Sequence, residues 1–191
     1  MKIIETSLPG VILIEPQVFS DARGFFLETW HQARYCELGL PATFVQDNVS
    51  YSLRGTLRGL HFQHPRAQGK LVSVLHGEVF DVVVDIRIGS PTFARWVSVV
   101  LSGENKQQLY IPEGFAHGFC VTSESALFAY KCTDFYHPPS EGGILWNDPG
   151  IGIEWPLRQP ILSVKDQTYP RLCEVLPERL PQYRNVPKTD N

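Results

Sequence analysis

The chain has 191 residues, which is long enough to bury a sizeable core without disulfides. Lysine and arginine total 17 against 20 aspartates and glutamates, a net charge of −3 without long charge runs. This balance argues against a nucleic-acid partner. Proline or a charge interrupts every candidate span of about 20 apolar residues, and the N-terminus lacks a signal-peptide pattern. We therefore expect no membrane association and a cytoplasmic location.

The four cysteines show no metal-binding or redox spacing. They are Cys36, Cys120, Cys132 and Cys173, and no pair forms a C-x-x-C motif. A chain of this length has core enough without disulfides. We expect them to be buried free thiols in a reducing compartment.

The first third of the chain contains several short strand patterns and one helix. Fifteen glycines, fifteen prolines and 22 aromatic residues favour turns and strands over long helices. Strands are predicted at residues 11–15, 25–28, 43–50 and 57–62. Residues 30–38 read as a helix that Thr29 caps and Gly39 ends.

The middle of the chain is a series of strands. Residues 80–88 alternate apolar and polar side chains, which predicts a half-buried strand. Short turns at Gly77 and at residues 89–92 predict that the strands 71–76, 80–88 and 96–101 are three consecutive antiparallel neighbours. Further strands are expected at 108–111, 118–122 and 126–132.

The C-terminal part carries only weak signals. Residues 173–180 resemble a helix that Pro177 breaks, and residues 181–191 read as a loose tail. No helices alternate with the strands, so a doubly wound parallel sheet is disfavoured. We predict one all-β domain over residues 1–191, a sandwich or barrel with one or two short helices and a β-rich core at about 5–166.

Polar residues within apolar strands mark the candidate site, because a buried polar group costs free energy unless it is paired. His61 is a candidate proton-transfer base, and its structural alternative is a core histidine bonded to backbone. Lys70 lies beside another strand and would supply a fixed cation where negative charge develops on oxygen. Its alternative is a surface lysine that buries only its aliphatic stem.

Other polar residues have weaker signals. Arg23, Arg58 and Arg66 offer guanidinium forks that suit phosphate. Tyr130 carries a hydroxyl that can donate a proton, and Asp166 is a candidate orienting acid for a histidine. Each of these residue types is also common in purely structural roles, so these assignments stay open at this point.

A metal site is the main chemical alternative. His61, His64 and His117 are imidazole ligands that a small barrel could collect. However, Gln63 stands two residues after His61, where a second histidine would be needed. Lys70 then places an ammonium where a carboxylate would help to hold a divalent ion. We therefore predict no metal.

Several motifs resemble the dTDP-4-dehydrorhamnose 3,5-epimerase family, and they follow the family order from residue 5 to residue 170. The Pro112-x-Gly114-x-x-His117 turn is also similar to half of the cupin signature. The motifs are RGFFLE (23–28), FVQDNVS (44–50), LRGLHFQ (57–63), QGKLV (68–72), GEVFDVVVDIRIGSPTF (77–93), YIPEGFAHGF (110–119), YKCTDFY (130–136), WNDPGIGIEWP (146–156) and LSVKD (162–166).

The resemblance implies a cupin-like jelly roll that forms a homodimer and needs no cofactor. The implied substrate is a dTDP-4-keto-6-deoxy sugar, inverted at C3 and C5 for the rhamnose of bacterial surface polysaccharides. It implies that His61 is the base with Asp166 as its partner, that Tyr130 is the acid and that Lys70 steadies the enolate. The implied substrate contacts are Arg23, Glu28, Gln46, Asp47, Asn48, Arg58, His117, Glu141 and Lys165, with Tyr136 stacking on thymine.

One geometric question and three functional alternatives remain at this stage. Strict alternation places Arg58 and His61 on opposite faces of a strand, so either a bulge at Gly59 or the sharing of residues across a dimer is needed. The nearest functional alternative is a mono-epimerase acting at C3 or C5 alone. A metal-dependent cupin oxygenase and a non-catalytic sugar-nucleotide binding module are the others.

Overall fold

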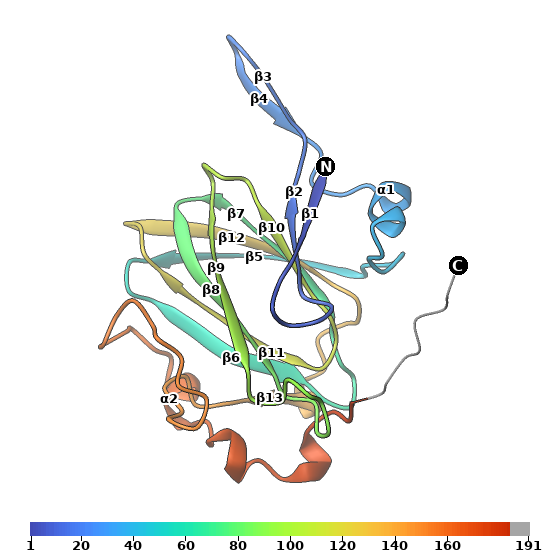
Figure 1. Cartoon of the computed structure of the whole chain (residues 1–191). Helices are drawn as coiled ribbons and strands as arrows, with labels where there is room; N and C mark the ends of the chain where they lie inside the picture. Colours follow the sequence, from blue (N-terminus) through green and yellow to red (C-terminus); the bar gives the residue numbers. More distant parts are fainter. Residues whose placement is uncertain (184–191) are drawn as a thin grey trace.

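Two antiparallel sheets lie face to face in the computed structural model, which describes residues 1–183 (Figure 1). One sheet has six strands in the order β1 (Lys2–Glu5), β2 (Ile12–Glu15), β10 (Gln108–Ile111), β7 (Lys70–His76), β12 (Ser125–Cys132) and β5 (Gln46–Leu53). The other has five, in the order β13 (Glu141–Gly143), β6 (Leu57–Gln63), β11 (Phe115–Val121), β8 (Glu78–Asp85) and β9 (Trp96–Ser102). The predicted all-β jelly-roll class is confirmed.

A separate two-stranded hairpin extends away from the sandwich. It consists of β3 (Val18–Asp21) and β4 (Gly24–Leu27), and it projects from the end of the molecule at which β2 lies (Figure 1). Its residues Phe19, Phe25 and Phe26 are all exposed. Of these three rings, that of Phe25 has the Lys106 ammonium above it, 4.5 Å from the ring centroid.

The main core fills the space between the two sheets. Val72 and Phe128 of the six-stranded sheet pack with Val83 and Phe119 of the other, and all four side chains are buried. Alternation along each strand explains this arrangement, since every second side chain points to the same face. The rings of Phe119 and Phe128 stack at a centroid distance of 4.2 Å.

A second core covers the outer face of the five-stranded sheet. Val84 and Ile86 pack there against Ile144 and Leu172 from the C-terminal third of the chain. β8 is therefore buried on both faces, and the prediction of a half-buried strand is wrong. The buried polar residue Asp85 is satisfied by Arg87, Ser90 and Thr92 instead of by water.

The predicted row of three consecutive strands is only partly correct. β8 pairs with β9 as expected, but β7 lies in the other sheet between β10 and β12. Between them the chain crosses from one sheet to the other at Gly77, which has φ +76. A Cβ atom on Gly77 would lie 1.9 Å from the carbonyl oxygen of Ser125, so the crossing requires glycine.

The first helix, α1 (Gln32–Glu37), begins later than predicted. His31 caps it, with Nδ1 accepting from the backbone N–H of Arg34, so the assignment of Thr29 as the cap is wrong. Gly39 follows the helix with φ +83, as a helix-ending glycine does. The helix covers part of the outer face of the six-stranded sheet through Tyr35 and Leu40.

The shortest elements were the least well predicted. Three short strands, β1, β3 and β13, and the helix α2 (Val164–Thr168) were missed. The expected helix over 173–180 is replaced by the 3-10 turns η2 (Leu172–Glu174) and η3 (Pro177–Arg179), and a further turn, η1 (Pro138–Ser140), precedes β13. Proline removes an N–H and clashes with the preceding turn, which prevents a continuous helix.

The expected loose tail begins in an ordered contact. The backbone N–H of Tyr183 donates to the carbonyl of Ile88 at 2.9 Å, and Gln182 forms an isolated bridge with the same residue. The rest of that predicted tail, residues 184–191, lies outside the described residues.

All four cysteines are free thiols. Cys120 and Cys132 are buried as expected, whereas Cys173 is exposed. Within residues 1–183, no helix has the length and apolar character to cross a bilayer.

Candidate active site

A bulge in β6 brings Arg58 and His61 to the same cavity. His61 lies opposite His117 on β11 and Arg58 lies opposite Phe119, so the register shifts by one residue between the two pairs. Gly59, within this bulge, has φ +130, and a Cβ there would lie 2.5 Å from the Cα of Gly118. Of the two explanations for placing Arg58 and His61 together, the bulge at Gly59 is therefore the one present, and only glycine fits its backbone.

His61 is bonded to Asp166 from the short helix α2. The His61 Nε2 to Asp166 Oδ1 distance is 2.6 Å, across 105 residues of sequence. Ser163 caps α2 by accepting from the backbone N–H of Asp166, and its hydroxyl donates to Asp166 Oδ2 at 2.7 Å. The helix and its cap thus hold one carboxylate oxygen on the imidazole.

The environment of Asp166 keeps its carboxylate ionised. Burial favours the neutral acid, but hydrogen bonds from His61 and Ser163 outweigh burial and place the pKa of Asp166 below its usual value. An ionised acceptor draws the ring proton of His61 to Nε2. The lone pair of the neutral imidazole then lies on Nδ1.

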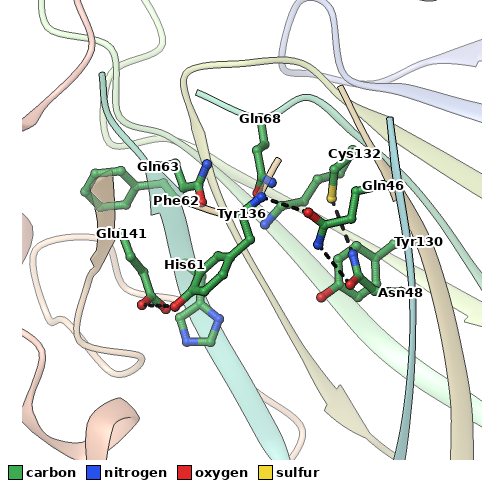
Figure 2. A pocket seen from close by; sticks show the side chains of 11 residues that line it. Gln46, Asn48, His61, Phe62, Gln63, Gln68, Tyr130, Cys132, Tyr136 and Glu141 are labelled. Atoms are coloured by element: carbon green, nitrogen blue, oxygen red, sulfur yellow. Dashed lines mark hydrogen bonds between the residues drawn. The ribbon is translucent and has the colours of Figure 1, made fainter. Parts of the chain in front are cut away.

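A cavity of about 320 Å³ opens beside His61 (Figure 2). Residues from β5, β6, β7 and β12 and from the loop after β12 surround it. Figure 2 shows Tyr136 and Glu141 close to His61, with Tyr130 and Asn48 on the opposite side. The lining residues are Gln46, Asn48, His61, Phe62, Gln63, Gln68, Lys70, Tyr130, Cys132, Tyr136 and Glu141.

A second, inner cavity of about 190 Å³ adjoins the first. His61, Lys70 and Tyr130 line both cavities, so these three side chains lie where the two meet. The other lining residues of the inner cavity are Ser50, Arg58, His117, Phe119 and Phe128. Three of the four predicted catalytic side chains therefore line the same two cavities, and the fourth, Asp166, is bonded to His61.

Burial changes the acidity of two of these groups. It lowers the pKa of Lys70, although the nearby groups of Cys132, Asp81 and Glu141 partly oppose this effect. It raises the pKa of the Tyr130 hydroxyl. Tyr130 consequently keeps its proton at neutral pH, as a proton donor must.

The mouth of the outer cavity carries a polar chain. The Tyr136 hydroxyl donates to Glu141 Oε2 at 2.9 Å, and Glu141 also forms an ion pair with Lys165. Burial acts to raise the pKa of Glu141, but the contacts with Lys165 and Tyr136 bring it below its usual value. The predicted residues Tyr136, Glu141 and Lys165 thus form one charged cluster beside His61.

His117 lies in the inner cavity and is held by an acid that sequence reasoning missed. Its Nε2 lies 3.0 and 2.9 Å from the two carboxylate oxygens of Asp81, and both residues are buried. Asp81 is a polar residue next to the valines of β8, which is the kind of signal that singled out His61. The alternation along residues 80–88 predicts a solvent-facing side chain there instead.

Three predicted substrate contacts lie elsewhere in this chain. Arg23 is in the turn of the projecting hairpin and pairs with Asp21. Glu28 pairs with Arg34 of α1. Asp47 pairs with Lys131 on the outer face of the six-stranded sheet, because strand alternation sends it away from its neighbours Gln46 and Asn48. None of the three lines the two cavities of its own chain.

The three histidines of the metal alternative are not assembled. His61 and His117 line the inner cavity, but His64 lines neither cavity. In the described range 1–183, no group of three or more His, Cys, Asp or Glu side chains is arranged to hold a metal ion.

The outer cavity also has lining residues that the sequence did not predict there, among them Cys132, Gln63 and Gln68.

Comparison with known proteins agrees with this site. A family model described as dTDP-4-dehydrorhamnose 3,5-epimerase matches residues 5–174. The protein of that name from Salmonella typhimurium is 59% identical over 179 residues, which cover 92% of this chain and 98% of the relative. The protein of that name from Neisseria gonorrhoeae is 57% identical over 167 residues, which cover 87% of this chain. That relative is longer, and the match covers only 51% of it.

A solved structure gives the same result. It is a Legionella pneumophila dTDP-6-deoxy-D-glucose-3,5-epimerase in complex with dTDP-4-keto-L-rhamnose, with a TM-score of 0.94 and 56% identity. The match covers 96% of this chain and 98% of that one. Since both the family model and these relatives span most of its residues, the chain belongs to the dTDP-4-dehydrorhamnose 3,5-epimerase family.

Proposed function

We propose that this chain inverts C3 and C5 of dTDP-4-keto-6-deoxyglucose and so forms dTDP-4-dehydro-L-rhamnose. The observation that carries the proposal is the meeting of His61, Lys70 and Tyr130 in one cavity, with His61 bonded to Asp166. A base, a cation and a neutral hydroxyl are the groups that epimerisation beside a ketone needs. The family membership supplies the nucleotide-sugar class.

His61 removes the proton from the carbon next to the ketone. With Nε2–H bonded to Asp166, Nδ1 offers the lone pair to the substrate. The Asp166 carboxylate then stabilises the imidazolium that forms, as the acid of a catalytic triad does.

Lys70 stabilises the charge that this step creates. Removing a proton from C3 or C5 places negative charge on the C4 oxygen as an enolate. A positioned donor in a water-poor site is typically worth about 3 kcal/mol to such a transition state. The ammonium of Lys70 is held among cavity residues, so it is in place before the charge develops.

Tyr130 returns a proton from the opposite face and thereby inverts the carbon. Tyr130 belongs to β12 of the six-stranded sheet and His61 to β6 of the five-stranded sheet, so the two groups approach the cavity from different sheets. Repeating the two steps at the second carbon gives the double epimer. Every step moves only a proton, so this mechanism requires neither a metal nor a redox cofactor.

The remaining polar residues bind the nucleotide and the sugar. Tyr136 at the cavity mouth presents the ring that stacks on thymine, while Glu141 and Lys165 lie beside it. Gln46 and Asn48 line the same outer cavity, and Arg58 and His117 line the inner one. Binding at these positions orients the sugar ring against His61.

A homodimer explains the location of Arg23, Glu28 and Asp47. Among residues 1–183, the outer face of the six-stranded sheet exposes Val49 and Tyr51 of β5. Exposed apolar side chains grouped in this way mark an interaction surface. We take a second copy of the chain as its occupant, with the projecting hairpin carrying Arg23 toward the partner's cavity.

The setting proposed for this activity is cytoplasmic synthesis of rhamnose for bacterial surface polysaccharides. Four free thiols suit a reducing compartment. A nucleotide sugar is the activated form from which glycan chains are built. The partners are therefore the dTDP-sugar and a second copy of the chain, without nucleic acid or membrane.

The test is incubation with dTDP-4-keto-6-deoxyglucose in heavy water, followed by NMR of the sugar ring. We expect deuterium at both C3 and C5 of the product. Deuterium at one carbon would identify a mono-epimerase instead, and an unchanged substrate would refute catalysis. A chelator added to the same reaction should not change the rate.

A further inference from the structure

The loop that carries Tyr136 is held by side-chain amides. Residues 133–137 follow β12 and contain no strand. Nevertheless, each of four consecutive loop residues forms a hydrogen bond between its backbone and the side-chain amide of a glutamine. The bonds are Gln68 Nε2 to Asp134 O (2.8 Å), Gln63 Nε2 to Phe135 O (3.3 Å), Tyr136 N to Gln46 Oε1 (2.8 Å) and His137 N to Gln63 Oε1 (2.8 Å).

These glutamines come from three different places in the fold. Gln46 begins β5, Gln63 ends β6 and Gln68 precedes β7. All three line the outer cavity, and Figure 2 shows Gln46 joined to the backbone of Tyr136. The two sheets therefore hold one loop between them.

Gln63 is the central member of this set. It is buried, with only 7% of its surface exposed, and its amide makes three hydrogen bonds. Besides its bonds to Phe135 and His137, its Nε2 donates to the carbonyl of Arg66 at 2.7 Å. Gln63 thereby ties the loop before β7 to the loop that carries Tyr136.

We infer that Gln63 is a positioning residue for nucleotide binding, which acts by holding the ring of Tyr136 at the cavity mouth. The inference rests on the proposed function, because it takes the base of the nucleotide as the ligand of that ring. Tyr136 is about half exposed, and its loop lacks the ladder bonds that would hold it in a sheet. Without the glutamine amides the loop would have to order itself when the nucleotide binds, which weakens binding.

The first experiment compares Gln63→Met with a matched control. Methionine keeps the length and volume of glutamine but removes all three hydrogen bonds. We expect the KM and the Kd for dTDP to rise about tenfold, because the loop must then order itself when the nucleotide binds. We expect kcat to stay within about threefold, because the reacting groups are untouched. The control is Gln107→Met, whose amide holds only Glu15 outside the site.

The second experiment tests whether Gln63 acts through Tyr136. Tyr136→Ala removes the ring, so adding Gln63→Met to it should raise the Kd for dTDP by less than about twofold further. An undiminished effect in the Tyr136→Ala background would overturn the inference. So would a Gln63→Met protein whose Kd matches that of the parent.

Two further measurements keep these outcomes distinct. If Gln63→Met fails to fold, Gln68→Met removes a single bond to the same loop, and we expect it to raise the Kd in the same direction with kcat preserved. An unchanged Kd in that variant would count against the inference. Failure of the parent protein to bind dTDP at all would contradict the proposed function, whereas a parent that binds normally isolates the role of Gln63.

Discussion

The chemistry depends on a small set of side chains whose properties are set by burial. His61 gains an ionised partner in Asp166, and Lys70 has a lowered pKa because its ammonium is removed from water. Tyr130 keeps its proton because burial raises the pKa of its hydroxyl. Burial thus favours the neutral hydroxyl of Tyr130, and it also allows the Lys70 ammonium to lose its proton at a lower pH.

The first prediction concerns the base and the acid. His61→Ala and Tyr130→Phe should each lower kcat at least about 100-fold, while dTDP still binds. NMR of the product gives the rate, and calorimetry gives the Kd for dTDP. In heavy water, Tyr130→Phe should still take deuterium into the substrate, since proton removal needs only His61. Full activity in both variants would refute the assignment.

The second prediction concerns the pH dependence of Lys70. A lowered pKa means that the ammonium deprotonates at a lower pH than the usual 10.5 of lysine, so kcat/KM should fall as pH rises through that lowered value. Burial raises the pKa of Asp81, but in its ionised form the Asp81 carboxylate opposes the loss of charge from Lys70. Asp81→Asn should therefore shift the alkaline fall of kcat/KM to lower pH.

The control for this shift is Glu104→Gln, which removes an exposed carboxylate outside both cavities. Its alkaline limb should match that of the parent in a pH titration of kcat/KM. If the alkaline fall of kcat/KM in Asp81→Asn also matched that of the parent, a charge effect of Asp81 on Lys70 would be excluded.

At the scale of elements, the site depends on irregularities in otherwise regular strands. The bulge at Gly59 turns Arg58 and His61 to one cavity, and the short helix α2 carries Asp166 to the same place. Both are backbone features with a specific sequence cause: a glycine that alone fits its position, and a serine cap. Regular alternation and a straight loop would place these groups apart.

The third prediction tests the Gly59 bulge. Gly59→Ala should lower the free energy of unfolding by about 3 kcal/mol, since strain at φ +130 adds to a clash with the backbone of Gly118. The matched control is Gly24→Ala, where φ is also +130 but no atom lies within 4 Å of the new Cβ. Urea unfolding measures both. Equal losses in the two variants would show that the close approach at Gly59 contributes nothing.

At the scale of the whole molecule, one chain brings together the proposed catalytic groups but leaves part of the predicted binding set outside the cavity. Arg23 lies on a hairpin that projects from the sandwich (Figure 1), and the outer face of the six-stranded sheet exposes the apolar side chains of Val49 and Tyr51. In the proposed homodimer, twofold symmetry would bring the hairpin of one copy to the other copy. In that proposal the complete site belongs to the pair.

The fourth prediction tests this arrangement by complementation. Arg23→Ala and His61→Ala proteins should each be impaired alone. Co-expressed in equal amounts they should recover about a quarter of the parent activity, because half of the dimers are mixed and each mixed dimer has one intact site. No recovery would show that Arg23 does not act on the partner's site. Sedimentation of Val49→Glu, which places a charge on the exposed sheet face, checks the interface itself.

The sequence was informative where local patterns carry the signal. Ten strands and the first helix were predicted from alternation, glycine positions and turns, because these features depend on neighbouring residues. A bulge at Gly59 was one of two explanations that the sequence left open for Arg58 and His61. His61 and Lys70 stood out as polar residues in apolar surroundings, and the motifs indicated the family. The short strands β1, β3 and β13 and the helix α2 were too brief to show a period.

The amino-acid sequence by itself determined the all-β class, the family and the chemical types present at the site. Only the tertiary structure decided that β7 and β8 lie in different sheets, that Asp81 is buried against His117 and that three distant glutamines hold the Tyr136 loop. Each of these depends on which distant segments pair and on what covers each sheet face. That choice minimises the free energy of the whole chain, so no window of neighbouring residues contains it.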